Sequence, residues 1–540
     1  MHFIAKTASL SCLARRIMAL SKSPLSTETG KKSWAQAFKA YLDPRALVML
    51  LLGFSSGLPY LLIFSSLSIW LKEAGFDIKV ITMFSWAMLG YSFKFVWSPL
   101  VNAVPIPLIT KQLGQRRSWL LVAQVIVAFS IIMLGSFNPT SDLILDYMAF
   151  FAVLLGFSAA TQDIVIDAYR IEIAEKTMQP VLSGMFMAGY RLGLIAAGAG
   201  ALFLAEYLGS TKTAYSYAAW QQTYYMMASL MTVGIVTTLA IKEPRVTRSQ
   251  QDRPMGDYLQ LFLLFLVSVI ALVSSFIVIG NALPDTTTPL QGFIFESIKF
   301  LGAVLMAMLT AAGLLKAKLI KKQVAVEMWV APIQDFFIRY GKKAVWLILL
   351  IGLYRISDIV AGTTSNLFYV NLGFSKTDIA LAVKTFGMGM SILGGILGGL
   401  LAGRFKIMNA MLMGAILASS SNLLFVMLAG KGHDFFYMYF AVMFDNLASG
   451  LASAIFVAFL SVLTNIRFSM VQYALLSSLM TLTPKILGGY SGAMVENMGY
   501  ASFFTFTALI GVPVLFLIYM VDKHVMGEHA KFKTVEYEDE

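Results

Sequence analysis

The chain has 540 residues, of which 58% are hydrophobic and only 13% are charged, and its mean hydropathy is +0.74. Soluble globular domains of this size do not normally have this composition, so we expect lipid to surround most of the chain. The formal net charge is +12, but Lys and Arg stand between apolar runs and not along one polar face, which argues against a nucleic-acid partner.

Cysteine and histidine are too scarce and too peripheral for the usual redox or metal chemistry. Cys12 is the single cysteine, which leaves no disulfide framework, metal knuckle or thiol with an evident partner. Histidines near the termini or in a loop are poor candidates for a metal site or proton relay inside a membrane. The four in this chain are His2, His433, His524 and His529. We therefore expect no cofactor, no bound metal and no enzymatic activity.

The first residues have a composition of their own. Met1 to Ser26 is free of acidic residues, rich in Ser, and basic at Lys6, Arg15, Arg16 and Lys22. That composition is typical of an organellar transit peptide. A basic cytoplasmic extension lying on anionic lipid, or an upstream start codon, would look the same. We expect residues 1–44 to be such an extension, and both alternatives stay open.

About fourteen apolar runs are long enough to cross a hydrocarbon core as helices, which takes about 20 residues. Six form a first block, near 46–71, 80–104, 119–138, 143–169, 182–206 and 221–241. Six form a second block, near 345–372, 379–403, 407–429, 435–464, 473–495 and 500–521. Two more lie between the blocks, near 258–280 and 299–320.

These runs divide the chain into five predicted parts. They are a basic extension (1–44), an N-terminal six-helix bundle (45–241), a linker with two extra transmembrane helices (242–344), a C-terminal six-helix bundle (345–521) and a charged cytoplasmic tail (522–540). The linker ends in a segment, 321–343, that mixes Trp329 and Phe336 with charged residues. This pattern is typical of an interfacial amphipathic helix.

Lys and Arg gather in alternate loops, which sets the orientation because positive loops stay on the cytoplasmic side. The loops after the second, fourth and sixth spans are basic, and those between them are poor in Lys and Arg. The basic ones hold Lys111, Arg116, Arg117, Arg170, Lys176, Lys242 and Arg245. Both termini are therefore predicted to be cytoplasmic, and the two linker spans preserve that parity.

Two blocks of six spans predict an all-α membrane protein with the major facilitator arrangement, in which two bundles are related by an axis along the membrane normal. Weak internal similarity supports this fold class. Gly189-Tyr-Arg-Leu-Gly193 in the fifth span and Thr483-Pro-Lys-Ile-Leu-Gly-Gly489 in the second block each place one cation beside small residues. Asp163 and Asp167 in the fourth span correspond to Asp445.

Charges inside the apolar runs are the most informative feature, because an ionisable group at the bilayer centre costs about 2.5 to 3.5 kcal/mol on insertion scales. Asp163 and Asp167 are spaced i, i+4 and so lie about 6 Å apart on one helix face. Two carboxylates that close repel, and one should hold a proton tightly, which suits proton coupling. The alternative is that either aspartate only pairs with Arg191, Lys94 or Arg170 to hold helices together.

The second block has its own candidates. Arg355 and Asp358 are spaced i, i+3, so they either neutralise each other or bind substrate. Asp445 has no charged neighbour nearby in the sequence and needs a partner on another helix, or water. Lys485 could face the same space or snorkel toward an interface, as Lys384 is expected to do. Gln162 and Tyr190, which adjoin Asp163 and Arg191, complete the candidate substrate- and proton-binding residues.

Several motifs, in order along residues 44–522, resemble the AmpG family of muropeptide permeases. The first half carries Leu52-Gly-Phe-Ser-Ser-Gly-Leu-Pro59, Phe93-Lys-Phe-Val-Trp-Ser-Pro-Leu100, Gln115-Arg-Arg-Ser-Trp-Leu120, Thr161-Gln-Asp-Ile-Val-Ile-Asp-Ala168 and Gly189-Tyr-Arg-Leu-Gly193. The second half carries Tyr354-Arg-Ile-Ser-Asp358, Phe444-Asp-Asn-Leu447 and Gln472-Tyr-Ala-Leu-Leu-Ser-Ser478. One departure is Asn102, where the family usually has an acidic residue. We expect a neutral hydrogen bond at the cytoplasmic gate, with Arg116 or Arg117 paired elsewhere.

The resemblance implies import of N-acetylglucosaminyl-anhydro-N-acetylmuramyl peptides across the bacterial inner membrane, driven by protons, for cell-wall recycling. It also implies an indirect role in β-lactamase induction, and the expected protein is a monomer whose partners are a glycopeptide substrate, protons and the bilayer. It places seven charged residues at or near a central cavity: Lys94, Asp163, Asp167, Arg191, Asp358, Asp445 and Lys485.

Other functions stay open. Acetyl-CoA transporters share the architecture, and the transit-like N-terminus would suit a eukaryotic member. Proton-coupled oligopeptide transporters also have twelve plus two spans, although the first helix lacks an ExxER-type cluster. A channel or a membrane-bound enzyme would need a filter-like repeat or a catalytic constellation, and the sequence shows neither. A receptor that does not transport would differ only in the absence of flux.

Overall fold

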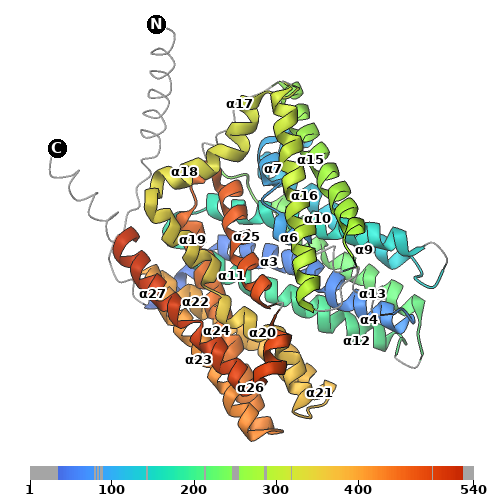
Figure 1. Ribbon diagram of the computed structural model, residues 1–540, viewed down its shortest axis with the longest axis vertical. Helices are drawn as coiled ribbons and strands as arrows, with labels where there is room; N and C mark the ends of the chain where they lie inside the picture. Colours follow the sequence, from blue (N-terminus) through green and yellow to red (C-terminus); the bar gives the residue numbers. More distant parts are fainter. Residues whose placement is uncertain are drawn as a thin grey trace, which may run out of the picture.

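The computed structural model describes residues 34–526 with short gaps. The gaps are 78–80, 82–83, 85–88, 142–143, 212–213, 246–253, 285–288, 318 and 489. The described part of the chain is helical and contains no strand (Figure 1). This confirms the predicted all-α fold class. Most of the predicted N-terminal extension and of the C-terminal tail lies outside the described residues.

The first half of the chain contains the helices of the first predicted bundle. They are α2 (Trp34–Lys39), α3 (Pro44–Leu61), α4 (Leu67–Glu73), α6 (Leu89–Phe93), α7 (Ser98–Ala103), α8 (Ile109–Leu113), α9 (Gln115–Ser136), α10 (Ile144–Glu172), α11 (Gln179–Ile195), α12 (Ala201–Tyr207), α13 (Tyr217–Leu230) and α14 (Thr232–Ala240). π-helical turns at Leu62–Ser66 and Ala196–Gly200 join α3 to α4 and α11 to α12.

The second half repeats this pattern. Its helices are α19 (Ala344–Leu353), α20 (Ile356–Asn371), α21 (Lys376–Ile379), α22 (Met388–Arg404), α23 (Ile407–Lys431), α24 (Phe435–Leu463), α25 (Ser469–Gly488), α26 (Ser491–Leu509) and α27 (Val512–Val521). The linker adds α15 (Met255–Ala282), α16 (Pro289–Lys316), α17 (Lys322–Ala325) and α18 (Ala331–Tyr340).

The described residues contain twelve helices long and apolar enough to cross a membrane. They match twelve of the fourteen predicted spans. The second predicted span is broken: α6 ends at Phe93, α7 begins at Ser98, and turns occupy Lys94–Trp97. The thirteenth corresponds to α25, a 20-residue helix with Pro484 inside it. The total of fourteen and the position of the termini stay predictions.

Local sequence explains where the first long helix begins. Asp43 caps α3: its carboxylate accepts hydrogen bonds from the backbone nitrogen of Arg45 (2.8 Å) and from its guanidinium, and Pro44 occupies the first helical turn. Pro is tolerated there because that N–H has no helical partner. The hydrogen bond from the Arg45 side chain lowers the pKa of Asp43 below its ordinary value.

We expect Asp43→Ala to lower the free energy of unfolding by about 1 kcal/mol at neutral pH, as loss of a helix cap does. Because the pKa of Asp43 is lowered by folding, this stabilisation is present above the ordinary aspartate pKa of about 3.9 and is lost as the pH falls through the lowered value. Thermal unfolding of both proteins across this pH range tests it. If the difference in unfolding temperature between the two proteins stayed the same at every pH, this account of the cap would be contradicted.

Small residues let the helices approach closely. The backbone of α3 lies against α11, where a Cβ on Gly189 would collide with the carbonyl of Leu50. The two halves meet in the same way, since a Cβ on Gly184 of α11 would lie 2.9 Å from the carbonyl oxygen of Gly395 on α22. Only glycine fits at such contacts.

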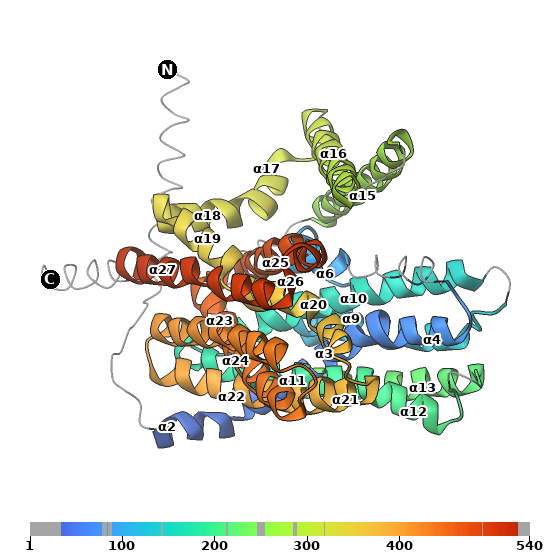
Figure 2. The ribbon, with the colours of Figure 1, turned by 60° about the horizontal axis from the view of Figure 1, so that its bottom comes forward.

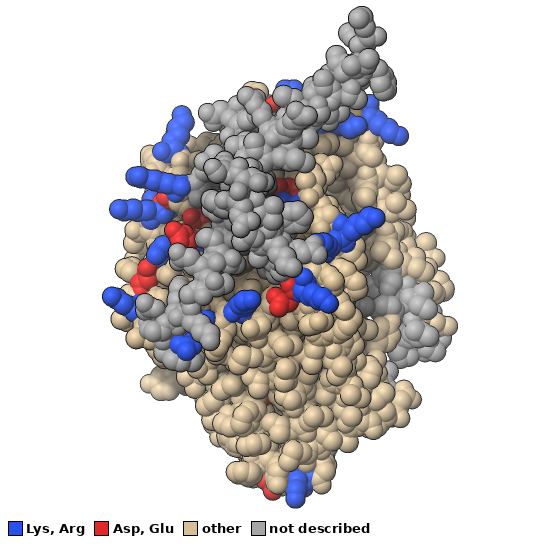
Figure 3. Space-filling model, turned by 90° about the vertical axis from the view of Figure 1, so that its left-hand side faces the viewer, with Lys and Arg blue, Asp and Glu red and all other residues tan. Residues whose placement is uncertain are grey.

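Hydrogen bonds join the two halves at one end of the molecule. Tyr41 donates to the carbonyl of Ile396 (2.7 Å), and Ser469 of α25 donates to Glu172 of α10 (2.6 Å). Away from this end the halves diverge: α4, α12 and α13 point one way, and α21 and α26 point another (Figure 1). Lys and Arg gather on the face at the joined end (Figure 3), which the loop charges predict to be cytoplasmic.

The two linker helices α15 and α16 pair with each other at one side of the molecule (Figure 2), where α15 contacts α7 and Phe300 of α16 lies 5.2 Å from the ring of Phe93. In each of the two helices, only 6% of the 18-residue apolar stretch is buried. Their surroundings must therefore be lipid or another protein. The predicted amphipathic segment forms α17, a π-helical turn at Val326–Val330 and α18, and its interfacial position stays a prediction.

Candidate functional site

Ionisable side chains of the first half meet on α10. Asp163 accepts a hydrogen bond from Ser56 of α3 (2.5 Å). Asp167, one turn further, forms ion pairs with Lys94 (3.3 Å) and Arg170 (3.1 Å). All of these side chains are buried. Asp167 thus pairs with two cations, as the structural alternative expects, whereas Asp163 forms no ion pair among the described residues.

The break between α6 and α7 positions Lys94. Trp97, at the end of the break, stacks on Phe157 of α10 with 4.3 Å between ring centroids and donates to Thr161 (3.1 Å). Pro99 follows in the first turn of α7. These contacts hold the irregular backbone against α10, so Lys94 reaches Asp167 from a fixed point. Broken helices often supply binding groups in transporters.

The second half has a similar break between α19 and α20. Arg355 lies in this break and pairs with Asp358, as the i, i+3 spacing predicts. Ser449 of α24 donates to Asp358 (3.3 Å) and accepts from Arg355 (3.1 Å). Asp445, one helical turn before Ser449, accepts a long hydrogen bond from Ser421 of α23 (3.4 Å). Asp445 lies within electrostatic range of Asp358 and Arg355, which are its charged partners on another helix.

Arg191 of α11, in the first half, lies near the charge cluster of the second half. It lies within electrostatic range of Arg355 and Asp358 of the other half, and of Tyr190 and Tyr60. Its buried Nε has no hydrogen-bond partner among the described residues. The rings of Tyr60 and Tyr91 meet edge to face at 5.6 Å, and the buried hydroxyl of Tyr91 is also unpartnered in the described part. This region between the halves thus offers unused donors beside aromatic faces.

One predicted residue does not join these clusters, and the side chain of another lies outside the described ones. Gln162 is fully buried within the first half, where it accepts a hydrogen bond from Ser55 of α3 (3.3 Å). Lys485 lies in α25, but its side chain is outside the described ones. The described residues contain no group of three or more potential metal ligands.

The joined end of the two halves contains a buried ion pair that sequence reasoning missed. Arg116 of α9 binds Glu172 of α10 at 2.6 Å, with exposed side-chain fractions of 1% and 0%. The same carboxylate accepts a hydrogen bond from Ser469 of α25 in the other half. Arg116 also donates to Asn102 (3.0 Å). The prediction that Arg116 pairs elsewhere is therefore confirmed, whereas the hydrogen bond at Asn102 is donated by the charged guanidinium of Arg116 and is not the neutral bond predicted.

Arg170 reinforces this closure. It is fully buried, donates to Ser461 of α24 (3.3 Å), and lies over the rings of Tyr473 (5.0 Å) and Phe186 (5.3 Å). One side chain thus contacts both halves while neutralising Asp167. The inner aspartate cluster and the closed end are physically connected.

The family model described as the Major Facilitator Superfamily matches residues 81–353. The chain belongs to this superfamily. It is a secondary transporter and not an enzyme, and its apolar helices make it a multi-pass protein of the inner membrane.

Named relatives confirm the resemblance to the AmpG permeases. "Putative transporter AmpG 4" of Rickettsia conorii is 29% identical over 487 residues, 90% of this chain and 99% of that protein. "Anhydromuropeptide permease" of Escherichia coli K12 is 29% identical over 486 residues, 90% of this chain and 81% of that protein.

Solved structures share the fold. The proton:xylose symporter XylE bound to 6-bromo-6-deoxy-D-glucose has a TM-score of 0.57 at 12% identity, and covers 90% of this chain and 96% of its own. FucP in the outward conformation has a TM-score of 0.57 at 10% identity, with 89% of this chain and 99% of its own covered.

Proposed function

We propose that this chain imports anhydromuropeptides from the periplasm into the cytoplasm by proton symport, so that the proton gradient drives uptake. The observation that carries the proposal is the pair of buried charge clusters, one in each half, with Arg191 of the first half near the cluster of the second. The full-length similarity to a protein named anhydromuropeptide permease supports the substrate class. Glycopeptides carry carboxylates and sugar hydroxyls, which suit the arginines and tyrosines of this region.

The arrangement of the halves fits one end of an alternating-access cycle. If the basic face is cytoplasmic, the buried contacts of Arg116, Glu172 and Arg170 close the path on that side, and the diverging ends face the periplasm. Periplasmic substrate would then enter between the halves. We propose that the two bundles, 45–241 and 345–521, rock about the charged region to release it inside.

Charge balance offers a means of coupling proton and substrate. Arg191 and Asp445 both lie within electrostatic range of Arg355 and Asp358, and the charges of these four groups sum to zero when both carboxylates are ionised. Protonation of Asp445 would leave one excess positive charge, and a substrate carboxylate would balance it. Asp163, which lacks a cation partner of its own in the described part, is the proposed proton site of the first half. Protonation of Asp445 and binding of the substrate carboxylate would therefore favour each other, because a buried unbalanced charge is costly.

We expect Arg191→Gln to raise KM for anhydromuropeptide roughly 10- to 100-fold, as loss of one charged hydrogen-bond partner of about 1.5–3 kcal/mol does. Arg191→Lys keeps the charge but loses the planar pair of donors of the guanidinium, so its KM should lie between those of the unmodified protein and Arg191→Gln. Initial uptake rates over a range of substrate concentrations measure this. A Gln variant with unchanged KM would remove Arg191 from substrate recognition.

Uptake into proteoliposomes tests the function itself. Labelled anhydromuropeptide would be supplied outside, with and without an inward proton gradient, alongside acetyl-CoA and dipeptides. Accumulation of the muropeptide only with the gradient is the expected result. Accumulation of acetyl-CoA or dipeptide instead would replace the substrate class, and equal uptake without the gradient would refute proton coupling.

A further inference from the structure

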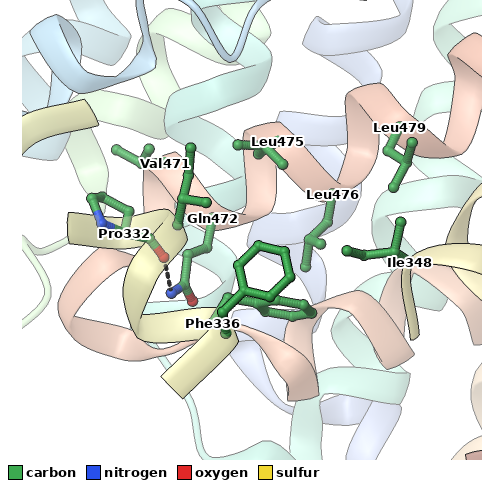
Figure 4. A pocket seen from close by; sticks show the side chains of 10 residues that line it. Pro332, Phe336, Ile348, Val471, Gln472, Leu475, Leu476 and Leu479 are labelled. Carbon is green, nitrogen blue, oxygen red and sulfur yellow. Dashed lines mark hydrogen bonds between the residues drawn. The ribbon is translucent and has the colours of Figure 1, made fainter. Parts of the chain in front are cut away.

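A cavity of about 240 Å³ lies between α18, α19 and α25, away from the charged clusters (Figure 4). Its walls are hydrocarbon, including Ile333, Phe336, Phe337, Ile348, Leu476 and Leu479. Its one polar lining residue is satisfied elsewhere: the amide of Gln472 donates to the carbonyl of Pro332 (2.9 Å) and to Asp335 (2.7 Å). A polar ligand would find no partner in such a cavity.

α18, which covers this cavity, is amphipathic. Phe336 is buried against the second half, whereas Ile333, Phe337 and Ile338 are 41%, 45% and 61% exposed. Exposed apolar side chains of that extent on a helix next to transmembrane segments fit the interfacial layer of a bilayer. At the elbow between α18 and α19 the chain becomes basic, with Lys342 exposed and Lys343 beside it.

We propose that this cavity binds one acyl chain of an anionic phospholipid, whose head group lies at Lys342. The dry walls select a hydrocarbon chain, and an empty apolar cavity of this size would be unfavourable. Lys342 and Lys343 stand in the chain between Phe337 and Ile348, which both line the cavity, and we place the head group at this elbow. Basic residues on the cytoplasmic side of a membrane attract anionic head groups.

Lipid binding at this site would affect the transport cycle, because the segment formed by the π-helical turn Val326–Val330 and α18 contacts both halves. On the first half, Trp329 donates to the carbonyl of Val96 (3.0 Å), within the break that carries Lys94. On the second half, Arg339 donates to Gln472 (3.0 Å) and to the carbonyl of Leu463 (3.0 Å). A bound lipid chain packs α18 against α25 and so stabilises the joined end.

Intact-protein mass spectrometry of the purified full chain with added phosphatidylglycerol tests the site. We expect the unmodified protein to retain one phosphatidylglycerol. Leu479→Trp fills the cavity and should abolish retention, as should Leu475→Phe if the Trp variant fails to fold. Leu349→Trp, on the exposed side of α19 outside the cavity, is the matched control and should retain the lipid.

The head-group contact needs its own pair of variants. Lys342→Glu should weaken phosphatidylglycerol binding about tenfold, whereas Lys406→Glu, at an exposed position between α22 and α23, should not change it. Equal retention by Leu479→Trp and Leu349→Trp would overturn the cavity as the site. Phosphatidylcholine bound as well as phosphatidylglycerol by the unmodified protein would overturn the anionic head group.

Discussion

Glu172→Gln should open the joined end of the molecule. The substitution keeps the shape of the side chain but leaves Arg116, which is 1% exposed, as an unpaired buried cation. Removal of one partner of a buried ion pair costs about 3–5 kcal/mol, and that cost falls on the closed arrangement alone, since separation of the halves lets water reach Arg116. A cost of this size shifts a two-state equilibrium by more than a hundredfold.

Distances between spin labels measure the shift. Cys12 is the only cysteine of the chain, so a Cys12→Ser background accepts label pairs cleanly. A pair at Lys111 and Lys406 reports the joined end and should lengthen in Glu172→Gln. A pair at Lys72 and Ser375 reports the diverging end and should shorten. Glu206→Gln, an exposed carboxylate on α12, is the control and should leave both distances as they are. Unchanged distances in Glu172→Gln would show that this ion pair does not hold the halves together.

The sequence predicted well whatever depends on local pattern. Long apolar runs gave the helices, because a bilayer demands about 20 apolar residues per span. The pair of Arg355 and Asp358 followed from i, i+3 spacing, and the pairing of Arg116 with a carboxylate other than residue 102 followed from one changed residue in a motif. Each of these rests on residues close together in the chain.

Contacts between the halves could not be predicted in this way. Ser469 meets Glu172 although 297 positions separate them, and nothing in either local sequence points to the other. The sequence did contain a sign of the break at Lys94, namely Pro99, which a prediction from hydropathy alone does not take into account. Pro99 has no N–H for the carbonyl of Phe95, and its ring would clash with that carbonyl in a continuous helix, so the backbone turns at Lys94–Trp97 although hydropathy predicts one span over 80–104.

Asp163→Asn should abolish gradient-driven accumulation while preserving exchange. The amide keeps the hydrogen bond with Ser56 but cannot bind or release a proton, so the first half would behave as permanently protonated. We therefore expect net uptake into proteoliposomes to fall at least about tenfold, since the empty carrier could no longer return without its proton. Counterflow of labelled against unlabelled anhydromuropeptide needs no net proton movement and should continue near the unmodified rate.

Asp167→Asn is the informative comparison, because Asp167 already carries ion pairs with Lys94 and Arg170. Its loss would take away the ion-pair partner that these two buried cations share, and we expect exchange and accumulation to fall together, with lower thermal stability. The ratio of accumulation to exchange therefore separates a proton site from a structural one. If Asp163→Asn still concentrated substrate against its gradient, the proton would have to be carried elsewhere. Asp445, the aspartate of the second half's charge cluster that has no ion pair among the described residues, would be the residue to substitute next.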